Sequence, residues 1–174
     1  MMDAPASPLI LTKFRVPTPR PRIIHRARLI ERLTFEINTG LVLVCAPAGY
    51  GKSTPLAEWS QSLRQESVPI AWYALDASDN DPIPFGSYLV ASLSHALGLT
   101  AELAHITQLL RSSPEIDLQR ILPTVINAVV ASDRECVLIL DDYHLISAPA
   151  IHSAVAFLLE HLPDVWWLPD SHGC

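Results

Sequence analysis

Apolar residues along this chain follow two patterns, short unbroken runs and longer stretches with helical spacing. The unbroken runs cover residues 41–46, 70–75 and 136–140, and their length suits strands buried on both faces of a sheet. Spacing of three and four predicts helices whose apolar faces fall within residues 26–38, 52–65, 85–97, 116–130 and 151–162. Strands that alternate with such helices predict an α/β protein with a parallel sheet.

Local signals refine the expected helices. Asp81-Pro82 predicts an N-cap and a first helical residue, and Ser113-Pro114 repeats that signal. Ser147 is expected to cap the last helix. Pro123 lies inside a helical stretch, where its missing N–H group and its ring are expected to break or kink the helix.

Composition and charge favour one packed domain with a basic arm. The chain has 174 residues, of which 49% are hydrophobic and 17% charged, a mixture that opposes intrinsic disorder. The net charge of −6 argues against electrostatic binding of nucleic acid by the whole molecule. Residues 1–40 nevertheless carry seven Lys or Arg against three acids. Five prolines predict an extended, basic arm over residues 1–25, with the domain proper over 26–174.

No segment predicts membrane insertion or secretion. No apolar run approaches the roughly 20 residues that span a bilayer, and the N-terminal residues lack a secretory signal pattern. Three cysteines give an odd count, and Cys45 and Cys136 lie in apolar runs where buried reduced thiols are typical. We therefore expect a cytoplasmic protein with no membrane partner.

The strongest chemical signal is the glycine-rich turn that follows the first apolar run. Residues 46–53 fit the phosphate-binding P-loop pattern G-x-x-x-x-G-K-[ST], with alanine in the first glycine position. Backbone N–H groups of such a loop, and the helix N-terminus behind it, bind phosphate. Lys52 would contact the β- and γ-phosphates and Ser53 would ligate Mg²⁺. The cofactor-binding candidates are Ala46, Pro47, Ala48, Gly49, Tyr50, Gly51, Lys52 and Ser53.

A second motif ends the third apolar run. Four apolar residues precede Asp141 and Asp142, which has the form of a Walker B strand, and ligands of open parallel sheets bind at this edge. Asp141 would hold Mg²⁺ through water, and Asp142 would be the catalytic residue that polarises an attacking water. The alternative is that two acids simply end a strand at the surface, which the preceding P-loop makes the less favoured interpretation.

Other candidates carry weaker signals. Three histidines near the two aspartates suggest a metal site, but their spacing matches no helical metal face and favours solvated or capping roles; they are His144, His152 and His161. Arg20, Arg22, Arg26 and Arg28 either contact nucleotide phosphate or DNA, or are solvated. The aromatic residues Trp59, Trp72 and Tyr73 are expected in the core.

Several blocks together resemble the ATPase domain of MalT-type regulators, which are LuxR-family bacterial transcription activators of the STAND class of P-loop NTPases. These blocks are LTKFRVP at 11–17, APAGYGKST at 46–54, AEW at 57–59, WYALD at 72–76 with DND at 79–81, and DDYHLI at 141–146. The resemblance covers residues 9–164 and implies an AAA+/STAND-like P-loop NTPase fold.

The resemblance also implies a switch controlled by ATP and ADP. Lys52, Ser53 and Asp141 match the family's phosphate, Mg²⁺ and Walker B positions, and Thr54 extends the cofactor-binding block. Arg20 and Arg22 fall in the family's N-terminal segment near the nucleotide. In such proteins inducer and ATP promote self-association. For this chain we expect slow hydrolysis, because positioning and charge stabilisation dominate phosphoryl transfer and the downstream elements that would supply them are absent.

The chain departs from the family pattern after residue 164. Residues 165–168 could still form a strand, which in the family lies between the Walker A and Walker B strands. The expected sensor and DNA-binding domains do not follow, which suggests a truncated or frameshifted reading frame and no direct DNA binding by this chain. Two alternatives remain: a small-molecule kinase of the P-loop type, although its arginines after the P-loop are scattered, and a non-functional remnant.

Overall fold

The structure is a computed structural model, and it describes residues 9–18, 27–36, 44–45, 53–112, 117–162 and 165–171. Four parallel strands form one sheet in the order β1 (Val44–Cys45), β4 (Val165–Ser171), β3 (Cys136–Asp141) and β2 (Ile70–Ala74). The predicted α/β class with a parallel sheet is therefore confirmed. The last segment forms a strand between β1 and β3, which is the position that the family resemblance implied.

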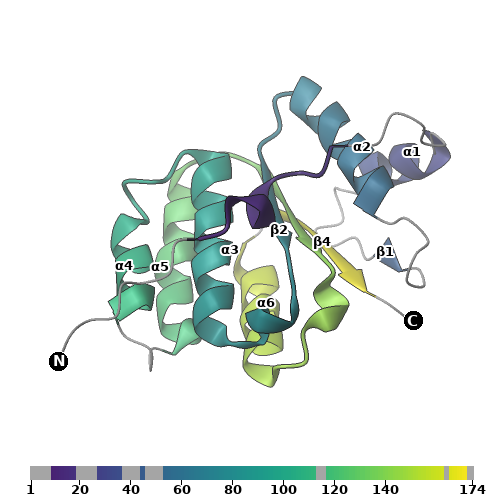
Figure 1. The fold of residues 1–174 in the computed structure, drawn as a ribbon. Helices are drawn as coiled ribbons and strands as arrows, with labels where there is room; N and C mark the ends of the chain where they lie inside the picture. Colours follow the sequence, from purple (N-terminus) through teal and green to yellow (C-terminus); the bar gives the residue numbers. More distant parts are fainter. Residues whose placement is uncertain are drawn as a thin grey trace.

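In the described part of the chain, six α-helices lie on the two sides of this sheet. They are α1 (Ala27–Glu36), α2 (Ser53–Gln65), α3 (Pro82–Leu97), α4 (Ala104–Ser112), α5 (Leu118–Ala131) and α6 (Pro149–His161). Helices α1 and α2 lie on one side of the sheet, and the other four lie on the opposite side (Figure 1). Short 3-10 helices η1 (Leu11–Phe14), η3 (Ala77–Asn80) and η4 (Tyr143–Leu145) complete the described elements.

Alternation along the strands divides the core between these two layers. In β3, Leu138 and Leu140 face the cluster under α3 to α6, whereas Val137 and Ile139 face the cluster under α1 and α2. Every residue of β3 is buried, as the unbroken apolar run predicted. Trp59, Trp72 and Tyr73 are each no more than 1% exposed, so their expected place in the core is confirmed. Cys136 is a buried free cysteine, as predicted, and burial raises the pKa of its thiol to about 12.

Two helix predictions need correction. Helix α4 was not expected, although Leu103, Ile106 and Leu110 recur at helical spacing and are buried. Helix α5 runs unbroken through Pro123, so the predicted break is wrong. Pro123 itself is exposed, while Leu122 and Val125 on either side of it are fully buried. Tertiary packing of these neighbours outweighs the loss of one backbone hydrogen bond.

The N-termini of the helices meet two kinds of side chain, one close in the sequence and one from a distant loop. Asp81 caps α3 as predicted, since its side chain accepts a hydrogen bond from the Ile83 N–H. Helix α5 is capped by Asp117 rather than by Ser113, which lies outside the described residues. Ser147 does not cap α6: the N-cap is Ala148, which has no side-chain oxygen to offer. The backbone at that end of α6 is instead met by a side chain from another loop, as described below.

The described part of the N-terminal arm crosses from one layer to the other. Its expected extended course is interrupted by the single turn η1, which lies beside β2 and α3 (Figure 1). Leu9 and Phe14 pack against the larger cluster, and Val16 packs against the smaller one. The arm therefore covers β2, the last strand in the sheet order. Such cover protects an edge strand from pairing with another chain.

No helix in the described part of the chain combines the length and the apolar composition that crossing a bilayer requires.

Candidate functional site

Two of the predicted site residues meet at the carboxyl edge of the sheet. Helix α2 begins at Ser53, and its hydroxyl donates a hydrogen bond to Asp141 Oδ1 at 3.1 Å. Asp141 is the last residue of β3 and is only 4% exposed. Backbone pairing fixes this position, because the Leu75 N–H donates to the Asp141 carbonyl at 2.9 Å. A helix N-terminus and a strand end thus bring together residues that lie 88 positions apart.

This pair has the chemistry that a magnesium site requires. Carboxylate and hydroxyl oxygens are ligands that Mg²⁺ accepts, and the ion is usually held by one or two such groups together with phosphate oxygens. A helix N-terminus carries partial positive charge, and α2 begins at Ser53 on the same side. Helix α2 is 13 residues long and is anchored by buried Leu56 and Trp59, so its first turn is held firmly against the sheet.

The remaining P-loop candidates lie outside the described residues. These are Ala46, Pro47, Ala48, Gly49, Tyr50, Gly51 and Lys52, together with Arg20 and Arg22 of the arm. The elements on either side of the loop are described: β1 ends at Cys45 and α2 begins at Ser53. This is the strand, loop and helix order in which a P-loop is found. Thr54 follows Ser53 in the first turn of α2 and is half-buried.

Asp142, the predicted catalytic residue, has an unusual backbone. Its φ of 61° and ψ of 31° lie in the left-handed region, which costs a residue with a Cβ atom about 1 kcal/mol or more. Its side chain is 45% exposed, and one of its oxygens lies 3.8 Å from His144 Nδ1. The strand therefore ends with a change of chain direction, and Asp142 does not continue the extended course of Asp141.

The three histidines make separate local contacts. His152 shares a 2.7 Å hydrogen bond with the Tyr143 hydroxyl, and His161 Nδ1 lies 2.8 Å from the Phe157 carbonyl oxygen. In the part of the chain that the structure describes, no three metal-ligating side chains gather into one group.

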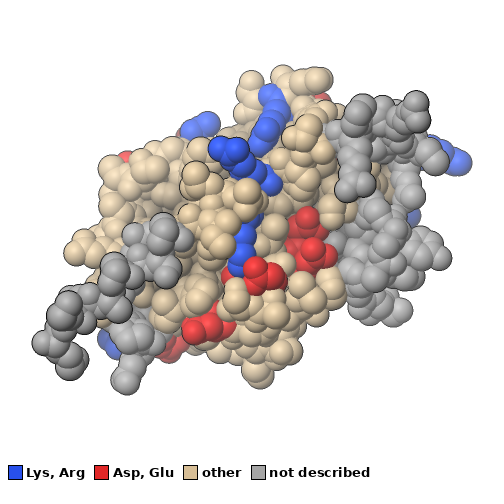
Figure 2. All heavy atoms as spheres, in the orientation of Figure 1, with Lys and Arg blue, Asp and Glu red and all other residues tan. Residues whose placement is uncertain are grey.

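A partly buried ionic cluster lies at the carboxyl end of β2, and no motif in the sequence indicated it. Lys13 of the arm is 8% exposed, and its ammonium contacts both oxygens of Asp79, at 2.8 and 2.7 Å, and Asp76 at 2.8 Å. It also lies over the Tyr88 ring, 4.7 Å from the centroid. Figure 2 shows a row of blue Lys and Arg atoms that meets red acidic atoms near the centre of this face.

Hydrogen bonds and charges set the pKa values in this cluster. Burial alone would lower the pKa of Lys13, but the hydrogen bonds and charges of Asp76 and Asp79 outweigh burial and raise it. Hydrogen bonds from Lys13 and Ser78 lower the pKa of Asp76 to about 2. Lys13 and Asp76 are therefore charged at neutral pH, and the cluster is an anchor for the arm. The signal that could have found it is a single lysine in an otherwise apolar arm segment, 9–14.

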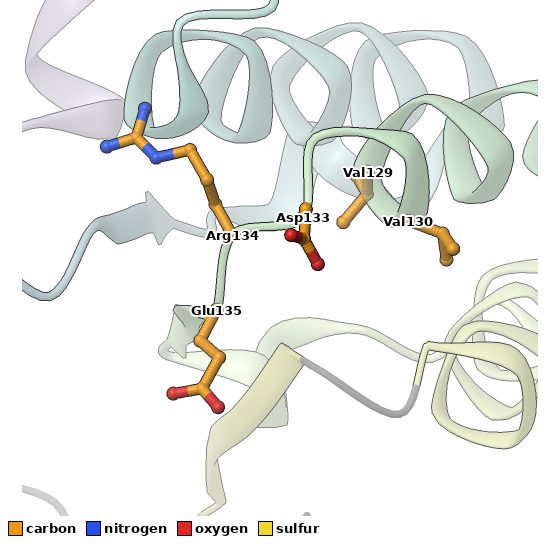
Figure 3. A pocket seen from close by; sticks show the side chains of 5 residues that line it. All are labelled: Val129, Val130, Asp133, Arg134 and Glu135. Atoms are coloured by element: carbon orange, nitrogen blue, oxygen red, sulfur yellow. The ribbon is translucent and has the colours of Figure 1, made fainter.

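A surface hollow of about 310 Å³ lies elsewhere, before β3. Val129 and Val130 of α5 line it together with three charged residues of the following turn, Asp133, Arg134 and Glu135. The Arg134 and Glu135 side chains point away from one another (Figure 3). Arg134 donates to the Leu97 carbonyl at 2.9 Å and so ties α3 to this turn. The hollow is at the amino end of β3, whereas Asp141 is at its carboxyl end.

The fold and this pair define an α/β protein with one parallel sheet and a hydroxyl–carboxylate contact at its carboxyl edge. A comparison with models of known protein families finds no match for the chain. Individual relatives do match, and all those described here are HTH-type transcriptional regulators called MalT. The chain is 34% identical to MalT of Cronobacter sakazakii, 33% to MalT of Yersinia enterocolitica and 32% to MalT of Klebsiella pneumoniae.

Each of these matches spans 156 residues, which is 90% of this chain and 17% of the relative. The resemblance to MalT-type regulators that the sequence blocks indicated is therefore confirmed over nine-tenths of the chain. The chain spans about one-sixth of the length of these curated relatives.

Proposed function

We propose that this chain binds ATP and ADP together with Mg²⁺, and that it is the nucleotide-dependent regulatory domain of a MalT-like transcription regulator. The observation that carries the proposal is the 3.1 Å contact between Ser53 at the start of α2 and Asp141 at the end of β3. The P-loop pattern of residues 46–53 supplies the phosphate-binding part of the same site.

Each residue has a distinct role in this proposal. The backbone N–H groups of residues 46–52 other than Pro47, and the ammonium of Lys52, bind the phosphates, with Thr54 beside them. Ser53 and Asp141 hold Mg²⁺, Asp141 through a water molecule, and Asp142 polarises the water that attacks the terminal phosphate. Arg20 and Arg22 of the arm contribute positive charge near the phosphates. Hydrolysis is slow, because phosphoryl transfer depends on precise positioning and charge stabilisation.

The regulatory part of the proposal follows from the relatives, whose names describe transcriptional regulators. We assign to this domain a cytoplasmic switch between ADP-bound and ATP-bound forms that controls self-association. DNA contact is assigned to parts of the regulator other than this domain, since the net charge of −6 does not favour binding to phosphate backbones.

Thermal unfolding with adenine nucleotides tests the proposal directly. A ligand that binds only the native state stabilises it, by about 2.7 kcal/mol when its concentration is 100 times Kd. We expect ATP with Mg²⁺ to raise the unfolding temperature, EDTA to reduce the shift, and Lys52→Ala to abolish it. Arg64→Ala, at the other end of α2, is the matched control and should keep the shift. A flat titration at millimolar nucleotide, or a full shift in Lys52→Ala, would contradict the proposal.

A further inference from the structure

The loops that follow β2 and β3 are joined by a single amide side chain, that of Asn80. Its Oδ1 accepts hydrogen bonds from the Ser147 N–H at 2.7 Å, the Ala148 N–H at 3.0 Å and the Ser147 hydroxyl at 3.2 Å. Its Nδ2 donates to the Leu145 carbonyl at 2.8 Å. The amide nitrogen and the amide oxygen of Asn80 therefore both bind a loop that lies more than 60 positions away in the sequence.

Asn80 binds the backbone just before the last helix, which has no side-chain cap of its own. Helix α6 begins after Ala148, which cannot accept a hydrogen bond through its side chain. The first N–H groups of a helix need partners outside the helix. Asn80 Oδ1 provides one for the backbone at this start, so the position of α6 depends on the loop that follows β2.

Asn80 is itself held in place by its own loop. The preceding residues form a capping box in which the Asp76 and Asp79 side chains each accept a backbone N–H. Asp79 is fully buried under the Lys13 ammonium. A side chain carried by so constrained a turn has little freedom to move with the loop that it contacts.

The turn that Asn80 contacts is the one that carries Asp142. Asp142 has a left-handed backbone, and such a conformation persists only where surrounding contacts enforce it. The Leu145 N–H donates to the Asp142 carbonyl at 3.0 Å, and the Ile146 N–H donates to the Tyr143 carbonyl at 3.0 Å. Asn80 holds the Leu145 carbonyl, at the far end of this turn.

We propose that Asn80 is a positioning residue that fixes the turn after β3 and thereby keeps Asp142 at its place next to Asp141. The catalytic part of this proposal rests on the proposed function, since Asp142 has a catalytic role only if the site hydrolyses a nucleotide. Asn80 does not contact the reacting groups in this proposal. It acts through the backbone of residues 142–148.

Amide hydrogen exchange of the nucleotide-free chain tests the structural half. In Asn80→Ala we expect the N–H groups of Leu145 and Ile146 to exchange at least about tenfold faster. These two groups do not bond to Asn80, so faster exchange reports loss of the turn rather than loss of one hydrogen bond. Asn127→Ala, an exposed asparagine on α5, is the control and should exchange at the wild-type rate. Unchanged exchange of Leu145 and Ile146 in Asn80→Ala would overturn the proposal.

Asn80→Asp keeps the proposal testable if the alanine variant unfolds. A carboxylate still accepts from the Ser147 and Ala148 N–H groups, but it cannot donate to the Leu145 carbonyl. We expect Ser147 and Ala148 to stay protected while Leu145 and Ile146 exchange faster. Equal protection of all four groups at the wild-type level would show that the Nδ2 donation does not hold the turn.

Single-turnover hydrolysis tests the catalytic half. We expect Asn80→Ala to lower the hydrolysis rate at least about tenfold while nucleotide Kd stays within about twofold of the wild type. Asp142→Asn should show a similar loss, and the double variant should lose no more than Asp142→Asn alone, because both act through one group. Additive losses, or a chain that binds nucleotide without hydrolysing it, would overturn this half. A wild type that binds no nucleotide would instead refute the proposed function, and the exchange result would still decide the role of Asn80.

Discussion

At the carboxyl edge of the sheet, two aspartates each contact a residue from a distant part of the sequence, and the two contacts differ in kind. At the end of β2, the Lys13 ammonium contacts both oxygens of Asp79, whose side chain is fully buried. At the end of β3, a neutral hydroxyl of Ser53 meets Asp141 in a part-buried contact of 3.1 Å. The first contact joins two opposite charges inside the protein, and the second joins a charge to a dipole.

This difference indicates that the two aspartates at this edge of the sheet, Asp79 and Asp141, have different roles. A carboxylate whose two oxygens are both engaged by a buried ammonium is fixed, because removing either charge leaves the other uncompensated. A serine hydroxyl binds more weakly and can turn toward another oxygen ligand or a metal ion at little cost. We therefore interpret the β2 end as the anchor of the arm, and in the proposed function the Ser53 hydroxyl at the β3 end is the group that turns to the ligand.

Removal of the Lys13 charge should have the largest effect. Lys13→Met leaves Asp79 buried without its cation, and breaking such a pair costs about 3–5 kcal/mol. The free energy of unfolding in urea measures this loss. Arg15→Met changes an exposed cation two positions along and should cost less than about 0.5 kcal/mol.

The double variant Lys13→Met, Asp79→Leu sharpens this test. Replacing both members of a buried pair by apolar residues is often neutral, so the double variant should be more stable than Lys13→Met alone. If Lys13→Met unfolds as readily as Arg15→Met, the anchor interpretation is wrong.

The pH dependence of stability should follow the same cluster. The pKa of Asp76 falls from 3.8 to about 2 on folding, so its contribution is present above pH 3.8 and is lost as the pH falls through about 2. The pKa of Lys13 is raised above 10.5, so its contribution is present below that pH and is lost at higher pH. Unfolding free energies measured across the acid range should decline less steeply in Lys13→Met than in Arg15→Met. Identical acid profiles for the two variants would show that Lys13 does not set the pKa of Asp76.

A smaller effect is expected at the Ser53 contact in the absence of nucleotide. Ser53→Ala removes one part-buried hydrogen bond and should cost about 1 kcal/mol, as urea unfolding measures. With nucleotide present, the same variant should lose the part of the thermal shift that depends on Mg²⁺. Ser53→Thr keeps the hydroxyl and is the control. A shift in Ser53→Ala that responds to Mg²⁺ as the wild type does would remove Ser53 from the metal site.

The smallest effect is expected at Tyr73, next to the anchor. Its hydroxyl is buried and forms no hydrogen bond with the described residues, and burial together with the charge of Asp79 raises its pKa. Tyr73→Phe should therefore change the free energy of unfolding by less than about 0.5 kcal/mol. Tyr88→Phe is the comparison, because the Tyr88 hydroxyl accepts from the Ile10 N–H at 3.0 Å and its loss should cost about 1 kcal/mol. A larger loss in Tyr73→Phe than in Tyr88→Phe would contradict this assignment.

Helix capping shows where inference from the sequence succeeds and where it fails. The Asp81 cap was predictable because the side chain and the N–H group that it accepts from lie two positions apart. The Ser147 cap was wrong because the polar group at the start of α6 comes from Asn80, which no local pattern indicates. Pro123 was expected to break a helix, and buried neighbours on both sides keep that helix continuous.

The sequence by itself determined the order of the strands and of the helices other than α4, and the two acids at the end of β3, because the period of apolar residues records which side of each element is buried. It also indicated that Ser53 and Asp141 belong to one site. Only the tertiary structure decided that Lys13 pairs with Asp79 and that Asn80 holds the turn after β3. Lys13 and Asp79 lie 66 positions apart, and Asn80 lies 65 positions from Leu145. Contacts between such distant residues depend on how the layers pack, and the spacing of apolar residues does not indicate them.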